Sequence, residues 1–572
     1  MDFEIQTMKT SLWFRNFLQL VAVSAIFFPV ISCSSDIALT AFDQPQEYQW
    51  LDQGWTEQER NHWHYISAGQ AFAPINWLLA LERVGTNQKL TDQKFLQSIG
   101  FLYDKKTNKN PYELPIGFAV GKDELFAKGM VGFTCAACHT TQIKYGKKGV
   151  RIDGGVSLVD LTIFFQQYSA SLVETYNNPE KWQKFSTAVR RGSQQTDKEL
   201  RDEVLSVLNA RKWASKELSE VAKGSVVNGP GRLDALNGIG NLLMGLSLKT
   251  ASNFHESSAP VSTPFLWDIW RFDWMHYNSS FSQPMAQNVL QVLGANGYTN
   301  FIDAKGNPNP VPSRWNSSVD IKALESTDIG FRKLLSPEWP SEIFGPYDTI
   351  KAARGEKLFA SQCASCHGAK ANPNPLNQKF QLSVTNIPIE RIGTDPVYAQ
   401  KFATQTFDIS KISNEQGRVS GSTALSYITE MVKNRAYDLL NYTPEERRIA
   451  DGFGRSNVMQ GVLVYRARTL NGVWSSPPYL HNGSVPNMYE LLSPVSERSS
   501  KFWVGSYEYD PEKLGFIHTK IENGFLFDTS ITGNSNQGHE FSDKPGAGVI
   551  GRLLTHQERL DIIEYLKSMK RL

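Results

Sequence analysis

Two copies of the sequence Cys-x-x-Cys-His constrain this chain more than any other feature. Residues 135–139 read Cys-Ala-Ala-Cys-His, and residues 363–367 read Cys-Ala-Ser-Cys-His. In such a motif the two thiols add to the vinyl groups of a haem, and the adjacent imidazole ligates the iron. The two intervening residues let both sulfurs reach one edge of the porphyrin. The sequence therefore predicts two covalently bound haem c groups, held by Cys135, Cys138, His139, Cys363, Cys366 and His367.

A Cys-x-x-Cys pair can also be a redox-active dithiol or half of a zinc site. A zinc site would need further cysteines or a closely spaced pair of histidines. The chain has only 5 cysteines, and the two motifs use all but one of them. A redox dithiol needs no histidine directly after it, whereas haem attachment accounts for the histidine in both copies.

The composition is that of a globular protein. A chain of 572 residues is long enough for two or three domains. Hydrophobic residues make up 41% of it and aromatic residues 12%, which suits a well-packed core. The formal net charge of +2 is close to neutral, so the sequence gives no indication of a nucleic-acid partner.

The remaining cysteine, Cys33, follows a predicted export signal over residues 1–32. Basic residues precede an apolar stretch over residues 17–30. Residues 30–33 read Val-Ile-Ser-Cys and resemble a bacterial lipobox, in which Cys33 would become the lipidated first residue. The alternative is an ordinary secretory signal with a spare cysteine. Both readings predict a location outside the cytoplasm, in the periplasm or at the outer membrane. Because no later apolar run could cross a bilayer, any membrane tie would be the lipid on Cys33 that the lipobox reading implies.

The predicted fold is mainly α-helical with long irregular loops, and it contains two cytochrome c-like haem domains. The first would cover residues 33–340 and the second residues 341–572. The second domain is expected to lie between two helices typical of a class I cytochrome c. Asp348 can cap the first of them, and residues 555–558 form a capping box that begins the last.

Those two terminal helices are expected to cross closely. Gly355 would allow the close approach, with Tyr565 as a contact. The unit between them is about 220 residues long, which is more than one haem requires, so an insertion between the helices is expected.

A dense aromatic stretch follows the first motif at residues 262–283. Its large side chains are Phe265, Trp267, Trp270, Phe272, Trp274, Tyr277 and Phe281. Such residues can serve packing, electron relay or a substrate cavity. The sequence leaves these alternatives open.

The sixth iron ligand decides what each haem can do. A second strong ligand makes an electron carrier, while an open position can bind peroxide or dioxygen. The candidates outside the motifs are His62, His64, His255, His276, His481, His518, His539, His556, Met459 and Met488. Spacing alone does not choose among them.

Residues 470–486 resemble the signature of the bacterial dihaem cytochrome c peroxidase superfamily. More narrowly, the chain resembles the rubber-oxygenase-like dihaem c-type cytochromes over nearly its whole length after the signal. The matching segments are residues 51–55, residues 132–134 with the first motif, residues 151–155 and residues 534–541.

The resemblance implies a division of labour between the two haems. The haem on His139 would be the reactive one, with a face free for oxygen or peroxide. The haem on His367 would have two histidine ligands, the second being His539. The resemblance also implies a calcium ion between the haem domains, which the sequence assigns to no residue.

Four further residues are implied by the resemblance as functional. Trp267 would stand between the two haems, and Phe281 would be the distal phenylalanine of the first haem. Tyr479 and His481 lie in the signature loop, which would be close to the C-terminal haem.

The resulting hypothesis is an exported dihaem c-type cytochrome that acts as a peroxidase-like oxidoreductase. It would activate hydrogen peroxide or dioxygen at the N-terminal haem, with electron transfer through the C-terminal haem. A peroxidase would take electrons from a small cytochrome or cupredoxin. One alternative is a dioxygenase that cleaves an unsaturated hydrocarbon without an external donor, and the other is a non-catalytic electron-transfer cytochrome.

Overall fold

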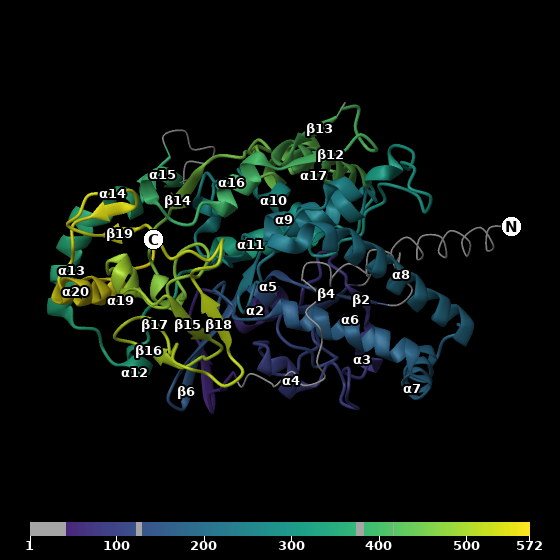
Figure 1. The fold of residues 1–572 in the computed structure, drawn as a ribbon, viewed down its shortest axis with the longest axis horizontal. Helices are drawn as coiled ribbons and strands as arrows, with labels where there is room; N and C mark the ends of the chain where they lie inside the picture. Colours follow the sequence, from purple (N-terminus) through teal and green to yellow (C-terminus); the bar gives the residue numbers. More distant parts are fainter. Residues whose placement is uncertain (1–41, 122–128, 373–381, 416) are drawn as a thin grey trace.

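A computed structural model describes residues 42–121, 129–372, 382–415 and 417–572 of the chain (Figure 1). The structure is 41% helical, and short strands lie between the helices. The helices agree with the predicted fold class, but the mixture with many short strands was not predicted. The export signal and Cys33 lie outside the described residues. Within the described residues, no helix is both long and apolar enough to span a bilayer.

Two small sheets surround the first motif. One contains β1 (Glu47–Trp50), β6 (Lys148–Asp153) and β5 (Thr140–Tyr145), in that order. The other contains β2 (Ala73–Pro74), β4 (Met130–Phe133) and β3 (Phe118–Gly121). The motif turn α5 (Cys135–Cys138) connects β4 to β5 along the chain. Both of its ends are therefore fixed by hydrogen-bonded strands.

Three long helices cover one side of this N-terminal region (Figure 1). They are α6 (Leu161–Asn177), α7 (Pro179–Arg190) and α8 (Asp197–Val221). Helix α8 begins with a capping box formed by Thr196 and Glu199. Its buried residues recur every three or four positions, so one stripe of the helix faces the core.

A second helical group forms the wall opposite the first motif. It includes α9 (Ala235–Gly240), α10 (Pro284–Gly294), α11 (Ile321–Lys333) and α17 (Gly421–Leu439). Helix α10 packs against the other three. Its apolar stripe, from Met285 to Leu293, is buried in that contact. The amide side chains of its other face are consequently left to line a cavity.

The predicted cytochrome c helices are α13 (Thr349–Gln362) and α20 (His556–Ser568). Asp348 caps α13, and Thr555 with Glu558 forms the capping box of α20, so both predicted caps are confirmed. A Cβ atom on Gly355 would lie 1.9 Å from the carbonyl oxygen of Asp561, so only glycine allows this approach of the two helices. Tyr565 is the next neighbour of Gly355, which confirms the predicted contact.

Replacing Gly355 by alanine is expected to destabilise the protein by about 1–3 kcal/mol, because α13 and α20 would have to move apart. Urea unfolding of the holoprotein measures the change. Gly330 in α11 is the matched control, since a Cβ there would meet only Trp55 at 3.7 Å. Gly330→Ala is expected to be neutral or stabilising by up to about 1 kcal/mol. Equal unfolding midpoints for the two variants would contradict the close crossing.

The hydrophobic core does not divide at residue 340. One core cluster joins Ile152 and Trp267 to Trp474 and Ile563. Another joins residues near 290 to residues near 430. A strand bridge also pairs Lys144 with Glu508. The two haem-motif regions therefore share their packing, and the predicted arrangement of two separate haem domains is not confirmed.

Candidate haem sites

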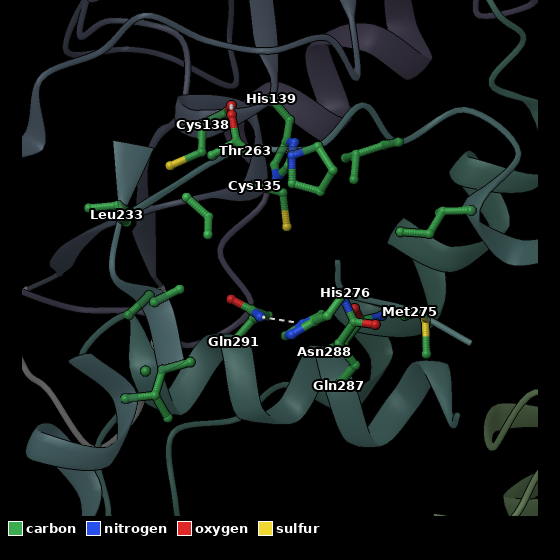
Figure 2. Close-up of a pocket in the computed structure, with 18 of the residues that line it drawn as sticks. Cys135, Cys138, His139, Leu233, Thr263, Met275, His276, Gln287, Asn288 and Gln291 are labelled. Atoms are coloured by element: carbon green, nitrogen blue, oxygen red, sulfur yellow. Dashed lines mark hydrogen bonds between the residues drawn. The ribbon is translucent and has the colours of Figure 1, made fainter. Parts of the chain in front are cut away.

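The first motif opens onto a cavity of about 330 Å³. Cys135, Cys138 and His139 lie on its wall (Figure 2). Both thiols are free, and burial raises the pKa of Cys135 to about 11 and that of Cys138 to about 12. Such thiols are not the reactive thiolates of a redox dithiol. No group of three or more His, Cys, Asp or Glu residues in the described chain could hold a metal ion, which also disfavours zinc.

His139 presents a neutral imidazole to this cavity. Burial lowers its pKa to about 4, and its Nδ1 atom, beside the backbone of Pro264, lacks a partner in hydrogen-bonding geometry. The hydroxyl of Thr263 donates to the carbonyl of Cys138 at 2.9 Å. The motif is thus held from behind by residues 263–264, and a neutral imidazole is the form that ligates iron.

The wall opposite His139 is polar. Figure 2 shows His276 together with Gln287, Asn288 and Gln291 of α10 across the open space from His139. Nε2 of His276 lies 3.5 Å from the amide nitrogen of Gln291, and its Nδ1 is buried without a hydrogen-bond partner. Desolvation lowers the pKa of His276 to about 3, so its imidazole is neutral.

The backbone of His276 has an unusual conformation. Its φ of +63° lies in the left-handed region, which is unfavourable for a residue with a Cβ. The strand bridge between Met275 and Phe281 closes this turn, and the ring of Phe281 packs 4.3 Å from the imidazole. Unfavourable backbone conformations of this kind gather at functional sites, where the surrounding structure enforces them.

Two arginines of the cavity wall form no direct ion pair among the described residues, and Asp273 is the carboxylate whose charge acts on both of them. Nη1 of Arg455 donates to the carbonyl of Phe272 at 2.8 Å, and Nη1 of Arg466 donates to that of Trp274 at 2.7 Å. The Nε atom of Arg466 is buried and makes no hydrogen bond. Buried cations are normally paired. The two propionates of a haem would supply direct partners for these cations, so the residues of this cavity fit a haem.

The second motif follows directly from α13. Cys363 ends that helix, and α14 (Ala364–His367) carries the remaining motif residues. Desolvation raises the pKa of Cys363 to about 12. Nδ1 of His367 donates to the carbonyl of Arg468 at 2.8 Å, which leaves Nε2 of this ring to ligate iron.

His539 faces His367 with 6.3 Å between the ring centres. An imidazole nitrogen lies about 2.0–2.1 Å from a first-row metal ion, so two rings that share one metal have centres about 6 Å apart. The observed spacing therefore fits a bis-histidine haem iron. Desolvation, followed by the nearby His367 and Arg498, lowers the pKa of His539 to about 3.

The loop that carries His539 is rigidly held. Arg498 donates to the carbonyls of Asn536, Gly538 and His539 at 2.6, 2.9 and 2.9 Å. The amide of His539 donates to the carbonyl of Ile392 at 2.8 Å. The imidazole is therefore positioned before any haem is bound.

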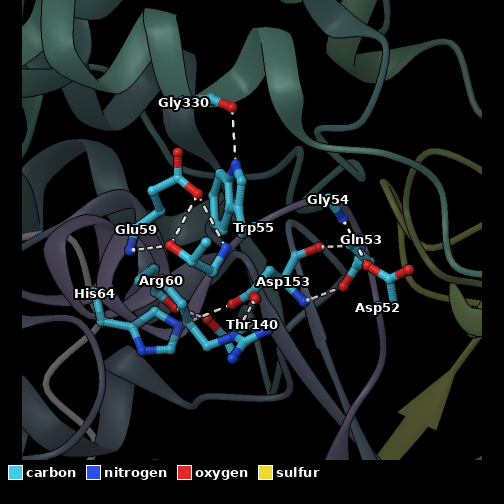
Figure 3. A network of polar contacts seen from close by, with 12 residues as sticks. Asp52, Gln53, Gly54, Trp55, Glu59, Arg60, His64, Thr140, Asp153 and Gly330 are labelled. Atoms are coloured by element: carbon cyan, nitrogen blue, oxygen red, sulfur yellow. Dashed lines mark hydrogen bonds and ion pairs between the residues drawn. The ribbon is translucent and has the colours of Figure 1, made fainter.

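A buried polar network lies behind the first motif (Figure 3). Asp153 accepts hydrogen bonds from Arg60 at 2.7 Å and from His64 at 2.8 Å, and Gln53 pairs with its backbone. The carbonyl of His64 accepts the hydroxyl of Thr134, the residue that caps the motif turn. The network brings together three of the segments on which the family resemblance rests, and it ties them to the first motif.

Replacing Asp153 by asparagine is expected to cost about 3–5 kcal/mol of stability, because Arg60 would be left as a buried cation without its counter-charge. Urea unfolding of the holoprotein measures this change. Asp52 is the matched control, since its side chain is 83% exposed. Asp52→Asn should stay within about 0.5 kcal/mol of the wild type. Similar losses for both variants would show that the network contributes little.

Comparison with known proteins assigns the chain to a family. A family model described as "RoxA-like, cytochrome c-like" matches residues 464–504, and one described as "Cytochrome C oxidase, cbb3-type, subunit III" matches residues 351–405. The uncharacterized protein y4iJ of Sinorhizobium fredii (strain NBRC 101917 / NGR234) is 35% identical over 595 residues, covering 96% of this chain and 98% of its own. The chain and y4iJ therefore belong to one family, and the two cytochrome c models match separate parts of the chain's C-terminal half. A second protein of that strain, the uncharacterized y4iM, is 30% identical over 239 residues, covering 39% of this chain and 49% of its own.

The two cytochrome c matches imply that the protein binds haem c and has a role in electron transfer. The cbb3-type match contains the second motif. The RoxA-like match over residues 464–504 contains the whole signature loop, residues 470–486, and the two matches together support haem c at the C-terminal motif. The first motif gains its support from the cavity described above.

Three of the other predicted residues are buried away from the first cavity. Trp267 is fully buried, donates to the carbonyl of Asn471 at 2.8 Å and stacks on Phe265 at 4.4 Å. Tyr479 is buried in the core, and His481 stacks on Tyr465 at 4.2 Å. None of the three predicted residues, Trp267, Tyr479 and His481, lines the first cavity.

The prediction for Phe281 needs correction. Phe281 is not on the cavity wall but lies behind His276, in the core formed with Met275 and Phe402. The side chain that faces His139 is the imidazole of His276. The physical reason is the tight turn over residues 275–281, which projects His276 into the cavity and folds Phe281 back onto it.

His276 appeared in the sequence only as one of several possible ligands. No spacing rule marks it, because it is distant from both motifs along the chain. The amide residues of α10 carry a weak sequence signal for a polar helix face. Gln287, Asn288 and Gln291 lie at helical spacing, beside a buried apolar stripe, and so share one face.

Proposed function

We propose that this RoxA-like cytochrome c is a dihaem oxidoreductase that reduces hydrogen peroxide at the first motif, with electrons delivered through the second. The observation that supports this most is His276, which faces His139 across the cavity with the amides of α10 around it. The polarity and donors of a distal pocket decide what a haem does with oxygen species. Most of the cavity lining is apolar, and its polar groups gather at His276 and the α10 amides, where a small polar oxidant would be bound.

Bound haem supplies the iron at which the O–O bond is broken and through which electrons arrive. The overall reaction takes one hydrogen peroxide, two electrons and two protons to two waters. The neutral imidazole of His276 offers an acceptor nitrogen, which would take the proton from one peroxide oxygen and return it to the other as that oxygen leaves. The amides of Gln291 and Asn288 would orient the peroxide by hydrogen bonds.

The electrons would come from a small redox protein, a cytochrome or a cupredoxin, outside the cytoplasm. This assignment follows from the predicted export signal and from the family's haem chemistry. His367 and His539 would give the second iron two strong ligands, which suits electron transfer rather than catalysis. Lipid on Cys33 would hold the protein at a membrane surface.

Electron paramagnetic resonance and visible spectra of holoprotein matured in a cytochrome c-assembling host test this proposal. One centre should be low-spin and inert, and the other should change on addition of peroxide, with peroxide consumed when a reduced donor is present. Two inert low-spin centres would instead make His276 an iron ligand and the protein an electron carrier. Oxygen-dependent cleavage of an unsaturated hydrocarbon without a donor would favour the dioxygenase and overturn the peroxidase.

A further inference from the structure

The histidine of the second motif is held by a backbone carbonyl. His367 donates its Nδ1–H to the carbonyl of Arg468 at 2.8 Å. Such a bond fixes the tautomer and the orientation of a ligating imidazole. Any change in the position of Arg468 would therefore turn or release the ring of His367.

The side chain of Arg468 reaches away from His367 toward the aromatic stretch. Nη1 donates to the carbonyl of Phe265 at 2.7 Å, and Nη2 donates to that of Trp267 at 2.6 Å. The guanidinium also stacks on the ring of Phe265, with its central carbon 3.8 Å from the ring centre. No carboxylate in the described chain forms an ion pair with it, and its Nε is buried without a partner.

The segment to which Arg468 donates these hydrogen bonds also contacts the first motif. Thr263 donates to the carbonyl of Cys138 at 2.9 Å, and the backbone of Pro264 lies beside Nδ1 of His139. Residues 263–268 therefore touch the first motif at one end and Arg468 at the other.

Two more side-chain bonds lock the segment to the chain after Arg468. Asn471 donates its amide to Asp268 at 2.7 Å, and the indole of Trp267 donates to the carbonyl of Asn471 at 2.8 Å. Residues 263–268 and 468–471 thus form one cross-linked unit, here called the bridge. It connects the carbonyl behind His367 with the backbone behind His139.

We propose that Arg468 is a positioning residue that couples the two haem sites through this bridge. Its two hydrogen bonds fix His367 relative to the segment that supports His139, and its positive charge raises the reduction potential of the His367 haem. A buried cation on the residue that holds His367 disfavours the ferric state, which carries one more positive charge than the ferrous state, and Asp268 is the carboxylate whose charge opposes this effect. The coupling rests on the proposed function, since it needs haem at both motifs, but the effect on the His367 haem does not.

Two substitutions separate the roles of geometry and charge. Arg468→Lys keeps the charge but loses the rigid fork that reaches two carbonyls at once, and Arg468→Met loses both. Both variants should shift the low-spin resonance of the His367–His539 centre, because the imidazole is no longer held in one orientation. Spectroelectrochemical titration should find a lower midpoint potential for that haem in Arg468→Met than in Arg468→Lys.

Arg211→Met is the matched control. Arg211 is a buried arginine of α8 that stacks over Tyr168 and lies away from the bridge. Its loss should leave the resonance and the midpoint potential of the His367 haem unchanged. Wild-type spectra and potentials in both Arg468 variants, even with lowered thermal stability, would reduce Arg468 to a structural role and overturn the proposal. If Arg468→Met does not assemble with haem, the low-spin resonance of Arg468→Lys alone tests the proposal, and an unchanged resonance overturns it.

The haem count of the wild-type protein keeps the two proposals apart. A single haem per chain would contradict the proposed function. The effect of the Arg468 substitutions on the His367 haem could still be measured. Two haems per chain, with unchanged spectra and midpoint potentials in the Arg468 variants, would contradict the coupling through the bridge but not the proposed function.

Discussion

Replacing His276 by phenylalanine is expected to lower kcat/KM for hydrogen peroxide by about 10²–10⁴-fold, the usual contribution of a positioned acid–base group. Phenylalanine keeps a flat ring against Phe281 but has no nitrogen to accept the proton of peroxide. The measurement is steady-state peroxide consumption with a chemically reduced donor. Haem content and the spectrum of the His367 haem should match those of the wild type.

His255→Phe is the matched control. His255 is half-buried, packs edge-on against Phe407 and does not line the cavity. Its replacement should leave peroxide turnover within about twofold of the wild type, since it has no part in proton transfer.

The sign of the His276→Phe effect is itself informative. If His276 ligates the iron in the resting protein, its removal opens a coordination position, and peroxide turnover rises rather than falls. A rise would overturn the acid–base role and identify the native protein as an electron carrier.

The motif residues and the His367–His539 pair could be predicted because their signals are carried by the sequence. Two thiols and an imidazole in five residues are rare in any other role. The partner of His367 lies far away along the chain, and only the family resemblance located it. The 6.3 Å between the rings of His367 and His539 agrees with that assignment.

His276 could not be predicted in the same way, because its position depends on a tertiary arrangement. The turn over residues 275–281 faces His139 only when α10 packs against α9, α11 and α17. The family resemblance implies a distal phenylalanine, and Phe281 is the residue to which that prediction was assigned. The left-handed φ of His276 decides which side chain enters the cavity, and no sequence pattern encodes it for a residue other than glycine.

The short strands and the shared core were missed for a related reason. Strands of two to four residues, such as β2 and β16 (Tyr509–Asp510), show no alternation of polar and apolar residues. The contact of Lys144 with Glu508 joins parts of the chain that a division at residue 340 would separate. The periodicity of apolar residues predicts the helices. It does not predict the long-range contacts by which residues before and after position 340 pack together.

Replacing His539 by alanine is expected to convert the C-terminal haem from six-coordinate low-spin to a form with an open position. The ring centre of His539 lies 6.3 Å from that of His367, the spacing expected for two imidazoles on one iron. Alanine removes the ligand, while the hydrogen bonds of Arg498 to the loop use backbone carbonyls and should persist. Visible and paramagnetic resonance spectra measure the loss, and added imidazole should restore the low-spin form by filling the vacated position.

His518→Ala is the matched control for His539→Ala. His518 is another half-buried histidine of the C-terminal region, and its Nε2 lies 3.4 Å from Glu490 rather than near a haem motif. Its removal should leave both haem spectra unchanged. If His539→Ala also left both spectra unchanged, the spacing of the two rings would not reflect iron ligation. If it changed the peroxide-reactive haem instead, the assignment of the two sites would be reversed. A change confined to the haem of His367, and reversed by imidazole, is the result that ligation by His539 requires.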